Sequence, residues 1–173
     1  MTRNNFILQL ITFGLYILTQ ILLFGDVVLF DKAFCFIYIG FILLLPFEIP
    51  LLNLLLISFF SGLAVDIFYS SMGIHASSTL LLAFLRPYWI SMITPRGGYE
   101  EVYAPTLKDL NLGWFTTYAF PLIVAHHFSL LYIEAGGFAD GWFTFVKALS
   151  STVFSFIVIV IVQMLFYRRR KMI

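Results

Sequence analysis

Long apolar runs recur along this chain and are separated only by short polar loops. Several reach the roughly 18 residues that a helix needs to cross the hydrocarbon core of a bilayer. Because 61% of the 173 residues are hydrophobic and only 11% are charged, the chain lacks the polar side chains to cover its surface in water. We therefore expect an all-α, polytopic membrane protein that has the lipid bilayer as its solvent.

The apolar runs predict six transmembrane helices within a single integral membrane domain, residues 1–173. The second run is the weakest, because at about 1.5 Å per residue a helix of its length falls short of a hydrocarbon core of roughly 30 Å. It is expected to cross with little tilt, to begin earlier near Val27, or not to cross fully. Pro46, Glu48 and Pro50 mark a tight turn after it, since proline ends a helix. The six runs are 6–24, 33–47, 51–68, 74–93, 114–133 and 148–167.

Basic residues set the expected orientation. The cluster at 168–171 directly follows the sixth run, and such clusters remain in the cytoplasm. Six crossings then return Arg3 to the same side, so both termini are expected to be cytoplasmic. The loop 94–113, with Arg96 and Lys108, is expected there too. The basic cluster is also suited to anionic lipid or a cytoplasmic partner, but a topology anchor is its simpler role. The loops expected outside are 25–32, 69–73 and 134–147.

Catalytic and cofactor-binding motifs are missing from the sequence. There is no nucleophile elbow, nucleotide-binding loop, HExxH, CxxC or dinucleotide fingerprint. We therefore expect no enzymatic activity, no cofactor and no metal site. The single cysteine, Cys35, excludes an internal disulfide, and the net charge of +1 gives no reason to expect nucleic-acid binding. No alanine precedes Ala33, so an Ala-x-Ala cleavage site is missing and the first run is expected to be retained.

Asp66 and His75 are ionisable residues on either side of the short turn 69–73. The turn brings them to a similar depth near the outer ends of the third and fourth runs. An ionisable group within a membrane span is costly, so it usually has a partner or a function. A hydrogen bond between this carboxylate and imidazole would reduce the cost of burying both. The alternative is that both side chains face water in the headgroup zone.

Three further ionisable residues lie deeper in the runs. Arg86 is about 18 Å from the outer end of the fourth run at helical rise, and we expect it to snorkel inward or to face other helices. Pro87 weakens the helix beside it. His126 and His127 point about 100° apart on a helix, so they are not expected to line one narrow site together. Hydrogen bonds in helix contacts suit them better than metal binding. A polar outer cavity, if present, would lie between these histidines and Asp66.

Small residues in the third and fourth runs suit a tightly packed hairpin of two helices. Gly62 and Ala64 allow close helix approach, and Gly73 can adopt a positive φ at the turn. Two sequences of this hairpin resemble the central motif of the rod shape-determining protein MreD family, namely Gly62-Leu63-Ala64-Val65-Asp66 and Gly73-Ile74-His75-Ala76. The chain also resembles this family in its overall size, its expected number of spans and its basic C-terminus.

This resemblance implies a multi-pass protein of the bacterial inner membrane that belongs to the cell-elongation machinery. Such proteins act without catalysis alongside MreC, the actin-like MreB, and the transpeptidase and glycosyltransferase that build the wall. They are needed for rod shape. The candidate interaction residues are then Gly62, Asp66, Gly73, His75 and Arg86.

The family is also similar in fold to the substrate-binding S components of energy-coupling-factor transporters. The resemblance therefore implies an S-component-like bundle and leaves a second function open. In that alternative the chain is the substrate-binding subunit of a small-molecule or vitamin transporter, and the outer polar residues bind the substrate. S components dock their energising partner through an Ala-x-x-x-Ala pattern on the first helix. The first run here has no alanine and only Gly14 in its interior, which favours the scaffold.

Overall fold

Six helices and one small β ladder make up the part of the chain that the computed structural model describes, residues 3–98, 102–138 and 140–165, with side chains from Ile7 onward. The prediction of an all-α fold is confirmed. The helices are α1 (Arg3–Leu23), α2 (Ile39–Leu43), α3 (Leu51–Tyr69), α4 (Ile74–Ile93), α5 (Leu112–Glu134) and α6 (Gly141–Leu165). The antiparallel strands are β1 (Val28–Leu29) and β2 (Ala33–Phe34).

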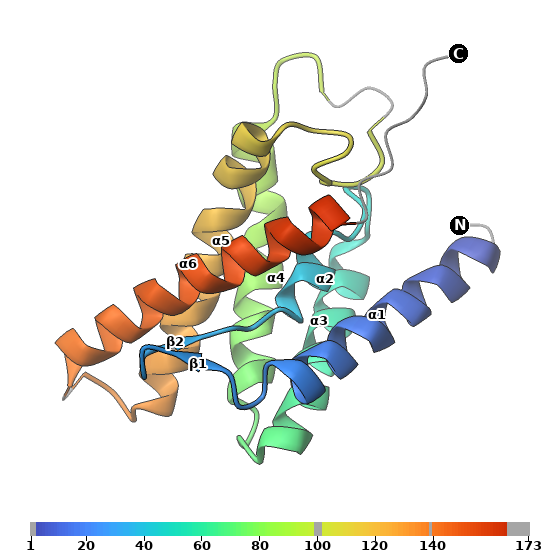
Figure 1. Ribbon diagram of the computed structural model, residues 1–173. Coiled ribbons are helices and arrows are strands. Elements are labelled where there is room, and N and C mark those ends of the chain that lie inside the picture. Colours follow the sequence, from blue (N-terminus) through green and yellow to red (C-terminus); the bar gives the residue numbers. More distant parts are fainter. Residues whose placement is uncertain (1–2, 99–101, 139, 166–173) are drawn as a thin grey trace.

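The helices α3, α4 and α5 lie side by side, each packed against the next in the sequence (Figure 1). The helix α6 runs obliquely across α5, and α1 packs against α3. The segment with β1, β2 and α2 passes between them, since β2 contacts α6 while α2 contacts α1, α3 and α4. This segment therefore forms the centre of the bundle.

The prediction of a continuous transmembrane helix over 33–47 is wrong. The segment starts with β2, continues as extended chain, and is helical only in α2. It still runs the length of the bundle: Gln20 donates to the Cys35 carbonyl at one end, and the Phe47 N–H donates to the Tyr103 carbonyl at the other. Extended chain rises about 3.3 Å per residue against about 1.5 Å in a helix. A run too short to span the bundle as a helix is long enough in this mixed form.

Side chains of the helices satisfy the backbone of this non-helical segment. Irregular backbone in an apolar interior is stable only where its polar groups are paired within the protein. Three N–H groups of the segment donate to side chains of α1 and α6, namely Phe34 to Ser151 Oγ at 2.9 Å, Phe36 to Ser155 Oγ at 2.9 Å, and Tyr38 to Gln20 Oε1 at 3.4 Å. The polar residues inside the apolar runs of α1 and α6 thus replace the helical hydrogen bonds that the segment lacks.

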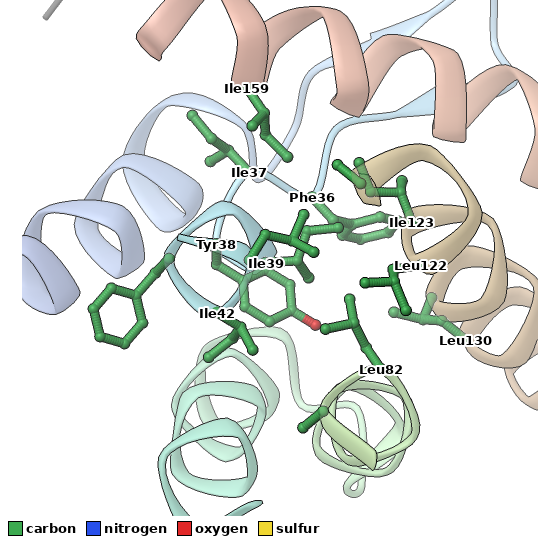
Figure 2. Close-up of a cluster of buried hydrophobic side chains, with 14 of the residues drawn as sticks. Phe36, Ile37, Tyr38, Ile39, Ile42, Leu82, Leu122, Ile123, Leu130 and Ile159 are labelled. Atoms are coloured by element: carbon green, nitrogen blue, oxygen red, sulfur yellow. The ribbon is translucent and has the colours of Figure 1, made fainter. Parts of the chain in front are cut away.

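The central segment also supplies much of the hydrophobic core (Figure 2). Phe36 and Tyr38 lie among side chains from α4, α5 and α6, and each is at most 6% exposed. The other labelled members are Ile37, Ile39 and Ile42 of the segment, Leu82 of α4, Leu122, Ile123 and Leu130 of α5, and Ile159 of α6. Because this segment is buried on all sides, its sequence is uniformly apolar.

The helix α6 begins at Gly141, earlier than the expected start at 148. Lys147, which was expected in a loop, is helical, and its ammonium has two partners there. It lies 3.1 Å from the Glu134 carboxylate and 4.5 Å from the centre of the Phe34 ring.

Two of the described helices, α3 and α6, are long and apolar enough to cross a membrane, with mean hydropathies of 2.1 and 2.3. The apolar part of α1 from Ile7 is shorter, and α4 and α5 carry buried polar residues that lower their hydropathy. Six spans and an inner-membrane location therefore stay predictions. Two features used for the orientation lie outside the described residues, namely the side chain of Arg3 and the basic cluster 168–171.

Candidate functional site

The carboxylate of Asp66, near the end of α3, lies against the N-terminus of α4. Its Oδ1 accepts the His75 N–H at 3.0 Å and its Oδ2 accepts the Ala76 N–H at 2.9 Å. These are donors that a helix leaves without partners in its own first turn, and Gly73 at the N-cap has no side chain to bind them. Asp66 therefore caps α4 from the neighbouring helix, with its negative charge at the positive end of the helix dipole.

Two glycines allow this arrangement. Gly73 has a φ of 87°, which residues with a Cβ rarely adopt. At Gly62, an added Cβ would lie 2.5 Å from Ala76 Cα and 2.6 Å from Ala76 N, so the backbones of α3 and α4 are in direct contact. The motif residues on which the family resemblance rests are thus the residues that join α3 to α4.

Ser71 completes a cluster that contains the three residue types of a serine hydrolase. Its Oγ lies 2.5 Å from Asp66 Oδ1 and 2.9 Å from His75 Nδ1, and His75 Nδ1 lies 3.0 Å from Asp66 Oδ1. In a catalytic triad the serine and the carboxylate bind opposite nitrogens of the imidazole. Here both bind Nδ1, while Nε2 is buried without a hydrogen-bond partner among the described residues. The imidazole therefore has no path to relay a proton from Ser71 to Asp66, and the cluster holds the turn.

The expected hydrogen bond between Asp66 and His75 is present, and the alternative that both face water is wrong. Asp66 is 4% exposed and His75 is 5% exposed. The Asp66 carboxylate can be buried because two backbone N–H groups and two side chains bind it in place of water.

All three histidines of the chain gather around the ring of Phe36. Ring centroids lie 5.6 Å away for His75, 6.1 Å for His126 and 5.1 Å for His127. The expectation that His126 and His127 would not share a site is wrong for these ring contacts, since both contact the same ring. Phe36 comes from the central segment, which the sequence prediction treated as a separate helix.

Both α5 histidines are hydrogen-bonded, His127 in the predicted contact with another helix and His126 with the central segment. His126 Nε2 lies 2.9 Å from the Tyr38 hydroxyl, and His127 Nε2 lies 2.9 Å from Ser155 Oγ. No group of three or more His, Cys, Asp or Glu side chains in the described part of the chain is arranged to hold a metal ion. Phe36 and Tyr38 fill the place where a polar outer cavity was considered.

Arg86 binds the backbone around the end of α2. Its Nε donates to the Tyr118 hydroxyl at 2.7 Å, its Nη2 donates to the Leu45 carbonyl, and Nη1 and Nη2 both lie 3.4 Å from the Pro46 carbonyl. Tyr118 in turn donates to the Leu43 carbonyl at 2.8 Å. Carbonyls that follow a helix have no intrahelical donors, so a buried guanidinium supplies them.

The snorkelling alternative for Arg86 is wrong, because its side chain is 1% exposed and faces α2 and α5. The ion pairs within the described ranges are His75–Asp66 and Lys147–Glu134, so Arg86 has no carboxylate partner there. The helix α4 continues past Pro87 to Ile93.

Sequence analysis missed the polar residues that bind the two charged groups, the α5 histidines and the backbone of the central segment. Each is a polar side chain within or beside an apolar run. That position could have indicated a hydrogen-bonding role, since a buried polar group needs a partner. They are Gln20, Tyr38, Ser71, Tyr118, Ser151 and Ser155.

Comparison with models of protein families, with curated proteins and with solved structures finds no match to this chain. The fold and the site define a helical bundle with an extended central segment. Its two buried charged groups, Asp66 and Arg86, bind backbone at the ends of helices.

Proposed function

We propose that this chain is a non-catalytic scaffold protein of the bacterial inner membrane, similar to the MreD family, that helps to assemble the cell-wall elongation machinery. In this role it binds an MreC-like membrane partner and acts with an MreB-like filament and the wall-synthesising enzymes. Its loss would abolish rod shape.

The observation that carries the proposal is the packing of the motif hairpin. Gly62, Asp66, Gly73 and His75 contact each other or the first turn of α4, and the cluster of Ser71, His75 and Asp66 has the wrong geometry for proton relay. A motif whose residues all serve packing is typical of a structural or interaction protein.

The distribution of side chains supports the membrane location. The described helices expose large apolar residues and bury polar ones, the reverse of a chain folded in water. The exposed residues include Leu8 of α1, Phe60 of α3, Phe84 of α4, Leu112 of α5 and Ile157 of α6. The buried polar residues include Asp66, Arg86, His126, His127 and Thr152. Lipid is the solvent that suits this surface.

The transporter alternative has less support. It needs an open polar site among the outer residues, and the side chains of Phe36 and Tyr38 occupy that place. Tyr38 is also hydrogen-bonded to His126 at 2.9 Å, so emptying the site would break a buried polar pair.

Depletion of the chain in the bacterium that encodes it tests the proposal. Cells should lose rod shape and incorporate wall precursor more slowly, and a tagged copy should co-purify with the MreC-like protein. Asp66→Leu should fail to restore rods, because the α3–α4 hairpin loses its cap. Asp26→Asn changes an exposed aspartate after α1 and should restore them fully.

Immunoblots of the membrane fraction separate loss of function from loss of protein. Rods that persist after depletion, together with lost uptake of a vitamin, would favour the transporter. Rods that persist with normal uptake would reject both functions.

A further inference from the structure

A cavity of about 300 Å³ lies beside Arg86, between α4 and the chain that leads into α3. Its walls are apolar except for Arg86 and Ser91 of α4 and for Thr94, the residue after α4. The lining residues are Phe47, Ile49, Leu51 and Leu54 on one side, and Arg86, Pro87, Ile90, Ser91 and Thr94 on the other. The cavity lies at the end of the bundle where the 44–50 turn meets the loop after α4, the end expected to face the cytoplasm (Figure 1).

Arg86 is the only formally charged side chain that lines this cavity. A guanidinium has five N–H groups, and four hydrogen bonds join it to Tyr118, Leu45 and Pro46. Both bonds to the Pro46 carbonyl are long, at 3.4 Å. With no carboxylate paired to it among the described residues, this cation has the charge and the remaining donor capacity to bind an anion.

We propose that the cavity binds one anionic phospholipid, with the phosphodiester beside Arg86 and the start of an acyl chain against the apolar walls. Arginine binds phosphate oxygens through charge-assisted hydrogen bonds, and basic pockets between helices at the cytoplasmic side of a membrane suit anionic headgroups. The inference rests on the membrane location proposed above but not on the role in wall synthesis.

The size of the cavity limits the part of the lipid that it holds. At about 300 Å³ it is at the small end of ligand pockets, which run from roughly 300 to 1,000 Å³. It therefore takes a headgroup and the first carbons of one chain. The remaining acyl carbons lie along the exposed apolar side chains of the helices, among them Leu51 at the rim.

Two serines of α4 provide a matched pair of variants. Ser91 lines the cavity, and Ser77 lies near the other end of the same helix. Both are exposed, and each donates to a backbone carbonyl three residues earlier, at 2.7 Å and 2.9 Å respectively. Ser91→Trp fills the cavity, while Ser77→Trp adds the same side chain elsewhere. Arg86 stays unchanged in both, because its hydrogen bonds hold the fold.

The test is native mass spectrometry of the protein purified from membranes in a neutral detergent. Phosphatidylglycerol and phosphatidylcholine with identical acyl chains are titrated separately. The unaltered protein and Ser77→Trp should bind one phosphatidylglycerol about tenfold more tightly than phosphatidylcholine. Both lipids have a phosphodiester, but the choline cation of phosphatidylcholine is repelled by Arg86 and offsets the phosphate charge. Ser91→Trp should bind the two lipids equally. Leu51→Trp, which fills the cavity from the side of α3, should also bind the two lipids equally.

Three results would overturn the inference. The first is equal binding of both lipids by the unaltered protein. The second is an unchanged preference in both cavity-filling variants while thermal unfolding shows them folded, which would place the lipid elsewhere. The third is full competition by inorganic phosphate, which would make the site one for a free anion. Absence of the chain from membranes would instead refute the proposed location, and bound lipid with normal cell shape would refute only the wall role.

Discussion

Asp66 and Arg86 show how single residues reconcile charge with an apolar interior. Each binds backbone groups that a helix leaves unpaired, Asp66 at the start of α4 and Arg86 after the end of α2. A buried charge is costly unless it is hydrogen-bonded, and an unpaired backbone group in lipid is costly as well. One contact removes both costs, so these two residues stabilise the fold without pairing with each other.

At Asp66 we expect a graded loss of stability. Asp66→Asn keeps one acceptor and should lower the free energy of unfolding by about 1–2 kcal/mol, while Asp66→Leu removes all acceptors and should cost about 2–4 kcal/mol. Adding His75→Leu to Asp66→Leu should restore little, because the N–H groups of residues 75 and 76 still lack an acceptor. Denaturation by SDS in mixed micelles measures these differences. Recovery of most of the loss in the double variant would mean that the imidazole, not the backbone, is the main partner.

The α3–α4 hairpin is the element that sequence analysis described best. A close contact at Gly62, the turn at Gly73 and the cap from Asp66 act on one short stretch, so the two helices have a fixed register and separation. The contact is between backbones, which leaves no flexible side chain to move aside.

Gly62→Ala should therefore force α3 and α4 apart and lower the free energy of unfolding by about 1–3 kcal/mol. Gly14→Ala in α1 is the matched control, because an added Cβ there has no neighbour within 4 Å. That change should stabilise its helix by up to about 1 kcal/mol. The same denaturation measurement compares them. A Gly62→Ala protein as stable as the Gly14→Ala protein would show that the hairpin has room to adjust.

On the scale of the whole molecule, the central segment and α3 determine at which end of the bundle each turn lies. Because 35–47 runs from one end of the bundle to the other and α3 runs back, the turn at Glu48 before α3 and the turn at Met72 after it lie at opposite ends (Figure 1). In a membrane, these turns would face different compartments.

Cysteine labelling in intact cells measures this arrangement. In a Cys35→Ala background, Met72→Cys should react with a membrane-impermeant maleimide from outside, since Met72 is 100% exposed. Glu48→Cys should react only after the cells are opened. Labelling of both positions in intact cells would mean that α3 does not cross the membrane.

The parts of the fold that could be predicted are those governed by local rules. Helix ends at 51, 74 and 93 follow from proline, glycine and apolar periodicity, and the bond between Asp66 and His75 follows from a five-residue turn. The central segment could not be predicted, because a buried helix and a buried extended chain can have the same uniformly apolar sequence. Its conformation depends on Ser151 and Ser155, which lie far away in the sequence.

That dependence has a consequence for how the protein is made. The hydrogen bonds from Phe34 to Ser151 and from Phe36 to Ser155 join residues 117 and 119 positions apart. A ribosome finishes the partners in α6 long after it has released the central segment, so newly made chain must wait with these amides unpaired. The helix α6 completes the interior that the earlier segments begin, and we expect nascent chains that end before α6 to be recognised as incompletely folded.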